Sequence, residues 1–336
     1  MKIGLTYDLK TAVEVRPGAP EDETEECDPP DTIDALAGEI ERLGHKVVRL
    51  GGGIEFLQSV LNEKVDFVFN ISEGRGTYRS REAQVPGVLE MLRIPYAGAD
   101  PLTLALCLDK PLTKRVAESL GVRTPRYAVL DHTQAVDLAL ADGLSLPLVV
   151  KPAFEGSSKG IRLTSKVGNL EDLAASVEAV HRMYRQPALV EEFIAGKEIT
   201  VGVTGNRPPQ VAGVMEVVPR NGAGDNFMYT LEVKRDWQRL VSYRCPAHLP
   251  PQTLKEIEGM ALALHKGLQC RDMARFDFRV DGKNRPYFLE VNPLPGLSPV
   301  YSDLPIMAGL MGQSYNQLIG GILEAALERC ELVGVK

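Results

Sequence analysis

Short apolar segments alternate with amphipathic segments through the first hundred residues, and this alternation constrains the fold more than any other feature of the chain. Strands that are separated by helices do not pair as hairpins, so they assemble into a parallel sheet with crossover helices. We therefore predict a parallel-sheet α/β domain over residues 1–100, in which Asp31 caps the first helix and Gly44 ends it. The predicted strands are 3–7, 46–50 and 65–70, and the predicted helices are 33–43 and 54–62.

The rest of the chain mixes strands, helices and long polar connections, which is typical of an α+β arrangement. We expect helical segments around Asp109 and Lys110, near 133–142, and over 169–184, 251–268, 304–311 and 314–329. The expected strands are 122–130, 146–151, a segment starting at Ile161, 188–194, 198–204 and 210–218, followed by a hairpin of 273–280 and 286–293.

The chain has 336 residues and a net charge of −7, and its acidic excess lies in one segment. Residues 21–31, called the acidic segment below, hold seven carboxylates and no Lys or Arg, and the remaining acidic and basic residues balance at 38 each. This charge distribution argues against a protein that wraps nucleic acid or lies on an anionic membrane. We interpret most of the segment as a solvated charge run, and expect one or two carboxylates near Glu26 and Asp28 to face a pocket.

The five cysteines are scattered and never form a CxxC pair, which argues against a disulfide framework or a zinc site. No segment approaches the ~20 apolar residues of a membrane helix, and the N-terminus lacks the apolar stretch of a signal peptide. We therefore predict a cytoplasmic protein.

The predicted hairpin near the C-terminus brings carboxylates together. Side chains alternate along a strand, so pairing across the DGKNR turn places Asp277 close to Glu290, with Asn292 and Arg275 beside them. Two carboxylates and an amide oxygen are hard ligands that suit Mg²⁺, although a salt-bridged exposed face is the alternative. The rigid NPLPGLSP segment that follows favours a ligand site, because Gly296 lets the backbone approach a ligand closely.

A second candidate site is a glycine-containing loop after a predicted strand. Lys151 ends the strand, and the loop PAFEGSSKG supplies Ser157, Ser158 and Gly160. A lysine can reach a phosphate while small residues expose backbone N–H groups to its oxygens, although most such loops are only turns and the Walker spacing is absent. Lys110 is a weaker candidate of the same kind. The segment LVEEFIAGKE can offer backbone groups to an adenine ring, but an exposed connector fits it as well.

In their order and spacing, these segments resemble the ATP-grasp superfamily and, within it, the D-alanine:D-alanine ligase family. The resemblance runs from about Pro86 nearly to the C-terminus through PGVLEMLRIPYAG, LDKPLTK, VVKPAFEGSSKG, LVEEFIAGKEITV, CPAHL, ARFDFRV and FLEVNPLPGLS. It implies an ATP-grasp fold of three α/β domains, with ATP between the second and the third. The domain bounds that we expect are 1–100, 101–187 and 188–336.

The matching motifs imply a role for each candidate residue in transfer of the ATP γ-phosphoryl group to a carboxylate, followed by amine attack on the acyl phosphate. Such chemistry needs positioning and charge neutralisation more than a protein nucleophile. The implied ATP-binding residues are Lys110, Lys151, Ser157, Ser158, Gly160, Glu191, Glu192, Phe193, Ile194 and Glu198. The implied ligands of two Mg²⁺ ions, or of Mn²⁺, are Asp277, Glu290 and Asn292, and the implied catalytic residues are Arg275, Ser157, Gly296 and Lys234.

The segments around the amino-acid pockets depart from the family pattern, whereas the ATP motifs do not. The family's first-loop glutamate, which helps fix a substrate ammonium group, has no unique match in the acidic segment. The HGxxGE stretch appears as NISEG, Arg235 follows Lys234 where the family has a tyrosine, and the stretch after Gly296 is one residue longer. The candidate substrate residues are Glu26, Asp28, Glu73 and Tyr229.

The resemblance implies a carboxylate–amine ligase that joins two amino acids, with D-alanine as a candidate substrate and peptidoglycan precursor synthesis as the setting. A specialised ligase for other amino acids or small acids is one alternative, and a nucleotide-binding regulator without turnover is another. The partners that we expect are small-molecule amino acids and a second copy of the chain in a homodimer, with no nucleic acid and no membrane.

Overall fold

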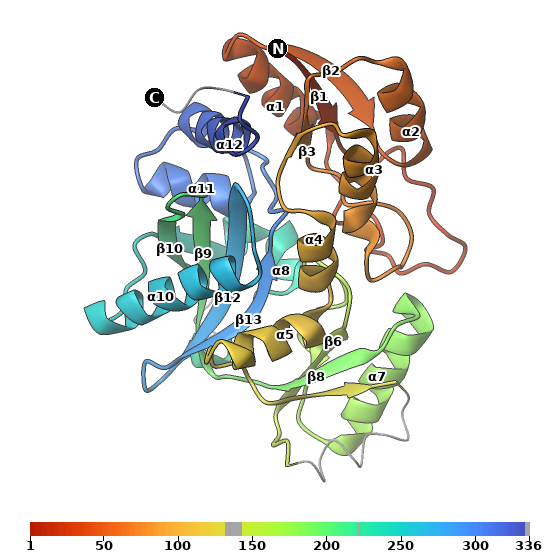
Figure 1. Cartoon of the computed structure of the whole chain (residues 1–336). Helices are drawn as coiled ribbons and strands as arrows, with labels where there is room; N and C mark the ends of the chain where they lie inside the picture. Colours follow the sequence, from red (N-terminus) through yellow and green to blue (C-terminus); the bar gives the residue numbers. More distant parts are fainter. Residues whose placement is uncertain (132–142, 221, 223, 333–336) are drawn as a thin grey trace.

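Three sheets organise the protein, whose computed structural model describes residues 1–131, 143–220, 222 and 224–332 (Figure 1). The parallel sheet lies at one end of the molecule, and the sheet that contains β6 and β8 lies at the opposite end (Figure 1). This mixed architecture is the one expected from the sequence. The helix predicted near 133–142 lies outside the described residues, and the domain boundaries stay predictions.

The N-terminal sheet is parallel, in the order β2-β1-β3-β4, as the alternation of segments predicts. Gly44 follows α1 with a φ of +87°, which a glycine adopts without strain, and the helix ends there as expected. The predicted cap by Asp31 is wrong, because Pro29 and Pro30 set the start of the helix and leave Asp31 in its first turn. The elements are β1 (Lys2–Thr6), α1 (Pro30–Arg42), β2 (Lys46–Gly51), α2 (Gly53–Asn62), β3 (Phe67–Asn70), η1 (Arg81–Ala83), α3 (Gln84–Leu92) and β4 (Tyr96–Ala97).

Two consecutive helices, α4 (Pro101–Leu108) and α5 (Lys110–Ser119), lead from this sheet to the middle of the molecule. Asp100 caps α4 and Asp109 caps α5, each by accepting a backbone N–H of the helix's first turn. The predicted helical region is therefore broken at Asp109. The break lets the Lys110 backbone N–H donate to Ala153 O at 3.1 Å, which fixes the start of α5 against the end of β6.

The middle sheet is antiparallel, in the order β5-β8-β6-β7, and is covered by α7. Asn169 caps that helix, which extends over the predicted range. The strand predicted from Ile161 is wrong: its N–H donates to Ser158 O and its carbonyl accepts from Leu231 N, so its backbone is committed to loop contacts and β7 begins only at Lys166. The elements are β5 (Tyr127–Leu130), β6 (Leu148–Pro152), η3 (Leu163–Ser165), β7 (Lys166–Val167), α7 (Leu170–Tyr184) and β8 (Ala188–Glu192).

The C-terminal sheet is antiparallel, in the order β11-β10-β9-β12-β13. Helix α10 packs on one face through Ile257, Ala261 and Leu264, while α12 joins the apolar core of the N-terminal sheet. The elements are β9 (Gly196–Thr204), β10 (Gln210–Pro219), η4 (Gly224–Asn226), α8 (Leu231–Arg235), α9 (Trp237–Leu240), β11 (Val241–Arg244), α10 (Pro251–Gly267), β12 (Met273–Asp281), β13 (Pro286–Asn292), α11 (Asp303–Leu310) and α12 (Tyr315–Arg329).

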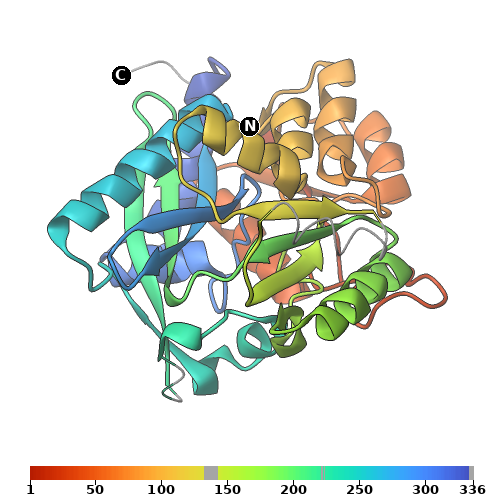
Figure 2. The ribbon, with the colours of Figure 1, turned by 90° about the horizontal axis from the view of Figure 1, so that it is seen from below.

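The C-terminal hairpin pairs in the predicted register, with Asp277 opposite Glu290 and Arg275 opposite Asn292. The hairpin runs up to the middle sheet, as the view from below shows (Figure 2). There the N–H of Phe288 on β13 donates to the carbonyl of residue 123, just before β5, at 2.8 Å. The two antiparallel sheets therefore meet beside the paired carboxylates.

All five cysteines are free thiols, which confirms the prediction of a fold without disulfides. Within the described ranges, no helix combines the length and the apolar character needed to cross a bilayer.

Candidate active site

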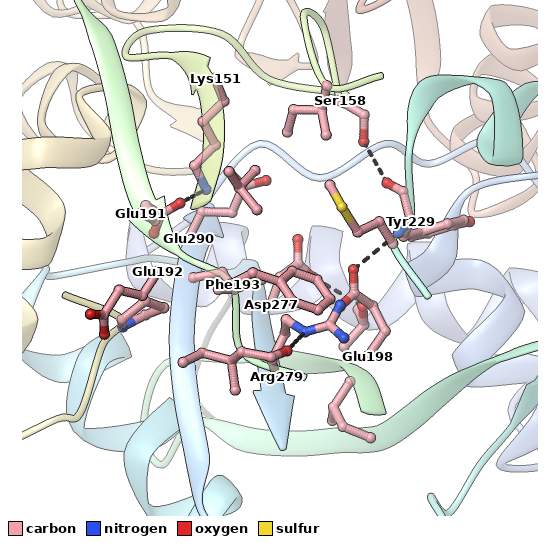
Figure 3. Close-up of a pocket in the computed structure, with 18 of the residues that line it drawn as sticks. Lys151, Ser158, Glu191, Glu192, Phe193, Glu198, Tyr229, Asp277, Arg279 and Glu290 are labelled. Atoms are coloured by element: carbon pink, nitrogen blue, oxygen red, sulfur yellow. Dashed lines mark hydrogen bonds and ion pairs between the residues drawn. The ribbon is translucent and has the colours of Figure 1, made fainter. Parts of the chain in front are cut away.

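A first cavity, of about 90 Å³, lies between the middle and C-terminal sheets and collects most of the predicted ATP-binding residues (Figure 3). Strands β6 and β8 supply one wall, and β9, β12 and β13 supply another. Glu192 also accepts a hydrogen bond from Ser145 N at 2.9 Å, which fixes the segment that follows β8. The predicted residues that line the first cavity are Lys151, Ser158, Glu191, Glu192, Phe193, Ile194, Glu198, Tyr229, Lys234, Asp277 and Glu290.

Two buried lysines share the Glu191 carboxylate at the inner end of the first cavity. Lys114 Nζ lies 2.5 Å from one Glu191 oxygen, and Lys151 Nζ contacts the other (Figure 3). Burial alone would raise the pKa of Glu191, but the two ammonium groups hold it below its usual value. Lys114 was not predicted, although it lies one turn after Lys110 on the same helix. The triad places two positive charges around one negative charge.

The segment after β8 holds the Phe193 ring between two cations. Lys166 Nζ is 3.6 Å, and Arg279 Cζ 4.7 Å, from the ring centroid. Arg279 also forms a 2.6 Å ion pair with Glu198 and donates to the Ile194 carbonyl (Figure 3). Arg279 was not singled out as a site residue, because in the sequence it alternates with Arg275 and Asp277 on one strand face, a pattern that an exposed salt-bridged face also explains. It fixes the orientation of both the aromatic ring and the carboxylate.

The paired carboxylates of the hairpin carry opposite pKa shifts. Burial would raise the pKa of Glu290, but Lys110 and then Lys151 lower it to about 2. Burial and the Glu290 and Asp303 charges raise the pKa of Asp277, although Arg275 opposes them. Glu290 therefore stays ionised close to a lysine, with 3.4 Å between its Oε2 and Lys110 Nζ.

The same hairpin offers oxygen ligands to a metal ion. Glu290 Oε2 is buried without a hydrogen-bond partner, Asp277 Oδ1 accepts from Thr200 Oγ1 at 3.0 Å, and Asn292 Oδ1 accepts from Leu294 N at 2.8 Å. No three His, Cys, Asp or Glu side chains gather around one point in the described part of the chain. The protein supplies two carboxylates and an amide, a set that fits Mg²⁺ when phosphate oxygens and water complete its shell.

The loop of residues 155–160, called the glycine-serine loop, lies over the first cavity in a conformation that ordinary residues rarely adopt. Ser157 and Ser158 have φ values of +49° and +60°. Ser158 Oγ donates to Tyr229 O at 3.2 Å (Figure 3), and Lys110 Nζ donates to the Glu155 carbonyl. Gly160 has a φ of +72°, and a Cβ there would meet the Pro152 ring at 2.5 Å. The loop is held from both sides.

A second cavity, of about 150 Å³, adjoins the first, because Tyr229 and Lys234 line both. Arg275 lies in its wall, 3.0 Å from Asp277 and 3.7 Å from Asp303. Burial and the nearby Arg275 charge lower the pKa of Lys234. The predicted residues that line the second cavity are Glu26, Asp28, Glu73, Ser157, Tyr229, Lys234, Arg275, Asn292 and Gly296. All the predicted catalytic and substrate residues therefore meet in this cavity.

The acidic segment is a structured strap over the glycine-serine loop, so the expectation of a solvated charge run is wrong. Asp22 is fully buried and accepts hydrogen bonds from Gly160 N and the Tyr184 hydroxyl, each at 2.9 Å. Glu26 accepts from Gly156 N at 2.6 Å and from Lys159 at 3.1 Å. Cations distant in sequence neutralise these carboxylates, which a local charge pattern does not reveal.

The outer edge of the acidic segment is tied to two further segments by arginines. Arg235 lies 2.5 Å from Glu21 and 2.8 Å from Glu25, and Arg162 lies 2.6 Å from Glu21. Arg235 stands where the family resemblance predicts a tyrosine. The strap therefore bridges the glycine-serine loop and helix α8 through ion pairs.

Arg81 joins the strap to the glycine-serine loop, and the sequence did not single it out. Its buried guanidinium contacts both Glu26 oxygens at 2.8 Å, Glu155 at 3.2 Å and the Phe154 carbonyl at 2.7 Å. In the sequence Arg81 lies in the Arg-rich stretch RGTYRSRE, which is typical of a solvated surface loop. Only the fold reveals that the third arginine of this stretch is buried.

The comparisons with known proteins agree with this geometry. The family profile described as "D-ala D-ala ligase C-terminus" matches residues 116–324. A D-alanine–D-alanine ligase of Pelotomaculum thermopropionicum is 31% identical over 89% of this chain and 92% of the relative, and that of Aquifex aeolicus is 33% identical over 86% and 92%. The crystal structure of the D-alanine–D-alanine ligase of Bacillus anthracis superposes with a TM-score of 0.74 at 25% identity, covering 99% of this chain and 100% of the other. This protein therefore belongs to the D-alanine–D-alanine ligase family of ATP-grasp enzymes.

Proposed function

We propose that this protein is an ATP- and Mg²⁺-dependent ligase that forms an amide bond between two small amino acids through an acyl phosphate. The observation that carries the proposal is the pair of adjoining cavities, with Arg275 and the Asp277–Glu290 pair in the walls around their junction. One cavity has buried lysines at its inner end and the other is polar and acidic, so a phosphoryl donor and a carboxylate acceptor can meet there. D-alanine, the amino acid named for the relatives, is the first candidate for both positions.

In this proposal the triphosphate lies beneath the glycine-serine loop. Lys110 and Lys151 offset its charge, and the left-handed turn at Ser157 and Ser158 directs backbone N–H groups toward it. Adenine binds to the hinge formed by Glu191, Glu192, Phe193 and Ile194, with Glu198 available to the ribose. Gly160 belongs, with Ser157 and Ser158, to the loop that closes over the phosphates.

Asp277, Glu290 and Asn292 would hold the divalent metal, because Glu290 has a buried oxygen without a hydrogen-bond partner. When bound, Mg²⁺ would neutralise charge on the phosphate oxygens during phosphoryl transfer. Two ions, and replacement by Mn²⁺, stay predictions.

The protein's own groups serve both chemical steps. The substrate carboxylate attacks the γ-phosphorus of ATP, and the amine then attacks the resulting acyl carbon, so an oxyanion develops next to Arg275. The Arg275 guanidinium and the Gly296 N–H stabilise that oxyanion, and Lys234, which lines both cavities, offsets the charge of the transferred phosphoryl group. A Cβ at residue 296 would meet Ser302 Oγ at 2.7 Å, so any larger residue there would require the Ser302 side chain to move.

The amino group of the acid substrate binds to Glu73 in this proposal rather than to Glu26. Glu26 already accepts from Arg81, Lys159 and Gly156 N, so its oxygens are occupied. The Glu73 side chain has no hydrogen bond or ion pair to any residue that the structure describes. Burial and the Glu82, Glu26 and Asp28 charges raise its pKa well above the usual value, because they disfavour its ionised form. A bound ammonium group would stabilise that ionised form.

A specialised ligase for another amino acid or small acid is the second candidate. It is favoured by the acidity of the second cavity, where five carboxylates and only two cations line the wall. A regulator without turnover would bind ATP and release no ADP. The implied homodimer stays a prediction that sedimentation analysis would check, as do cytoplasmic localisation and a role in peptidoglycan precursor synthesis.

A substrate panel tests the proposed function. We expect ADP release with Mg²⁺, ATP and D-alanine, and a dipeptide of matching mass in the product mixture. Activity only with other D- or L-amino acids would favour the specialised ligase, and ATP binding without ADP release or amide product across the panel would contradict the proposal.

Arg81 is expected to position the glycine-serine loop. Arg81→Met removes one of the two cations that contact both Glu26 and Glu155, so the loop loses one of its links to the strap. We expect the KM for ATP to rise by about 10-fold, which corresponds to the loss of one charge-assisted contact. Steady-state kinetics at saturating amino acid measure this, and Arg182→Met, at an exposed position of α7, is the control. An unchanged KM for ATP would remove the assigned role.

A further inference from the structure

Asp28 presents to the second cavity a carboxylate that makes no hydrogen bond or ion pair with any residue that the structure describes. Its backbone is fixed, because Asp28 N donates to Asp8 O at 2.9 Å and Lys10 N donates to Asp28 O at 3.1 Å. Its side chain has no hydrogen bond or ion pair within the described ranges, yet it lines the same cavity as Arg275 and Gly296. Burying a carboxylate without a hydrogen-bond partner is costly. A fixed, partly buried carboxylate in the wall of a reaction cavity therefore indicates that a ligand supplies the missing partner.

We propose that Asp28 is the general base that takes the proton from the attacking amine. The inference rests on the proposed function, since it assigns a role in the second step of that reaction. An amino acid enters at neutral pH as an ammonium ion, which has no lone pair for attack on the acyl phosphate. A proton acceptor within the cavity is therefore required.

The other acidic groups in the wall of the second cavity are already engaged. Glu25 pairs with Arg235, Glu26 with Arg81, and Asp303 lies 3.7 Å from Arg275. Only Glu73 and Asp28 have unengaged carboxylates among the described residues of this wall.

Position separates the two unengaged carboxylates. Glu73 lies on the side of Glu26 and Arg81, under the glycine-serine loop, and also lines the small cavity behind the strap. Asp28 lies on the side of the loop that follows Gly296, where burial and, among other charges, that of Asp28 raise the pKa of Tyr301. In this proposal the attacking amine approaches a carbonyl held at Gly296 from the side of Asp28 and Tyr301, all of which line the second cavity.

The electrostatic surroundings suit a base that works at neutral pH. Burial and then the Asp8 carboxylate raise the pKa of Asp28 to about 7. The other titratable groups that face Asp28 from neighbouring elements are Glu73, Tyr301 and Tyr315. Arg75 is ion-paired with Asp8 and does not contact Asp28. A base with a pKa close to the working pH combines a useful ionised fraction with adequate basicity.

The step balances without a further reagent. The ammonium N–H bond breaks and an O–H bond forms on Asp28, which leaves a neutral amine. The amine nitrogen then bonds to the acyl carbon, the C–O bond to phosphate breaks, and the second amine proton leaves with inorganic phosphate. Asp28 returns its proton to solvent when the products depart.

Hydroxylamine provides a direct test. It is mostly neutral at pH 7, so its nitrogen has a lone pair and no base is needed to deprotonate it before attack. With wild-type enzyme, Mg²⁺, ATP and D-alanine, we expect dipeptide formation to rise with pH through about 7, as Asp28 ionises. Hydroxamate formation with hydroxylamine should lack this dependence. If dipeptide formation and hydroxamate formation by the wild-type enzyme rose with pH in the same way, the proposal would be overturned without the use of any variant.

The variant Asp28→Asn sharpens the test. We expect dipeptide formation at pH 7 to fall by about 100-fold or more, with hydroxamate formation within about threefold of wild type. Asp28→Glu should recover part of the dipeptide rate, and Asp31→Asn, an exposed carboxylate of the same segment, should match wild type. An equal loss with both nucleophiles, or an unchanged dipeptide rate, would overturn the role of Asp28. Absence of both products with the wild type would instead contradict the proposed ligase function.

Discussion

Glu290→Gln is expected to lower the rate of amide formation by about 10³-fold, because it removes the charge of a carboxylate that pairs with Lys110 and that we propose as a metal ligand. The carboxylate stays ionised down to about pH 2 in the folded protein and lies 3.4 Å from Lys110. Glutamine keeps the shape of the side chain but supplies no charge. Phosphate release and product mass, both measured at saturating ATP and Mg²⁺, report this loss.

Glu178→Gln is the matched control for this variant, since Glu178 is exposed on α7 and lies outside both cavities. It should retain the wild-type rate. Circular dichroism should show that Glu290→Gln is folded. A Glu290→Gln enzyme with more than a tenth of wild-type activity would contradict the assignment of Glu290 to the reaction centre.

Glu191→Gln is expected to destabilise the folded state by about 3 to 5 kcal/mol, because it leaves Lys114 and Lys151 buried without their shared counter-ion. Both lysines are buried, and Lys114 has no exposed surface. Denaturant unfolding at pH 7 measures the change as a lower midpoint at constant slope.

The pH dependence of this loss has a definite sign. The pKa of Glu191 is depressed on folding, so its contribution is present above the unfolded pKa and is lost as pH falls through the folded value. The difference in the free energy of unfolding between wild type and Glu191→Gln should therefore become smaller as the pH falls. Adding Lys114→Met to Glu191→Gln should recover part of the stability by removing one unpaired charge. If Glu191→Gln lowered the free energy of unfolding by less than about 1 kcal/mol at pH 7, the stabilising role assigned to the buried triad would be contradicted.

Features that depend on local periodicity could be predicted from the sequence. Strand alternation and turn length are short-range properties, and they placed Asp277 opposite Glu290 in the register that the structure has. The parallel sheet of the first hundred residues followed in the same way. Ile161 was misassigned because its backbone bonds to Leu231, a contact that no local pattern contains.

The partners of the acidic segment could not be predicted, because they lie far away in the chain. Arg81 is 55 residues from Glu26, and Arg235 is 214 residues from Glu21. A run of carboxylates without nearby cations is usually solvated, and only tertiary structure reveals that cations distant in the chain surround this one. Lys114 and Arg279 were missed for a related reason: a charged residue among other charged residues of a helix or strand does not reveal which distant carboxylate it pairs with.

The strap formed by the acidic segment has a consequence for the lifetime of the intermediate. It crosses both the glycine-serine loop and helix α8, and it holds them through Asp22, Glu26 and the Arg235 ion pairs. In the proposed reaction, an acyl phosphate formed beneath the strap would be shielded from water while these contacts hold. Uncoupled ATP hydrolysis, seen as ADP release in excess of amide, should therefore increase with ionic strength, because salt weakens the exposed outer ion pairs first.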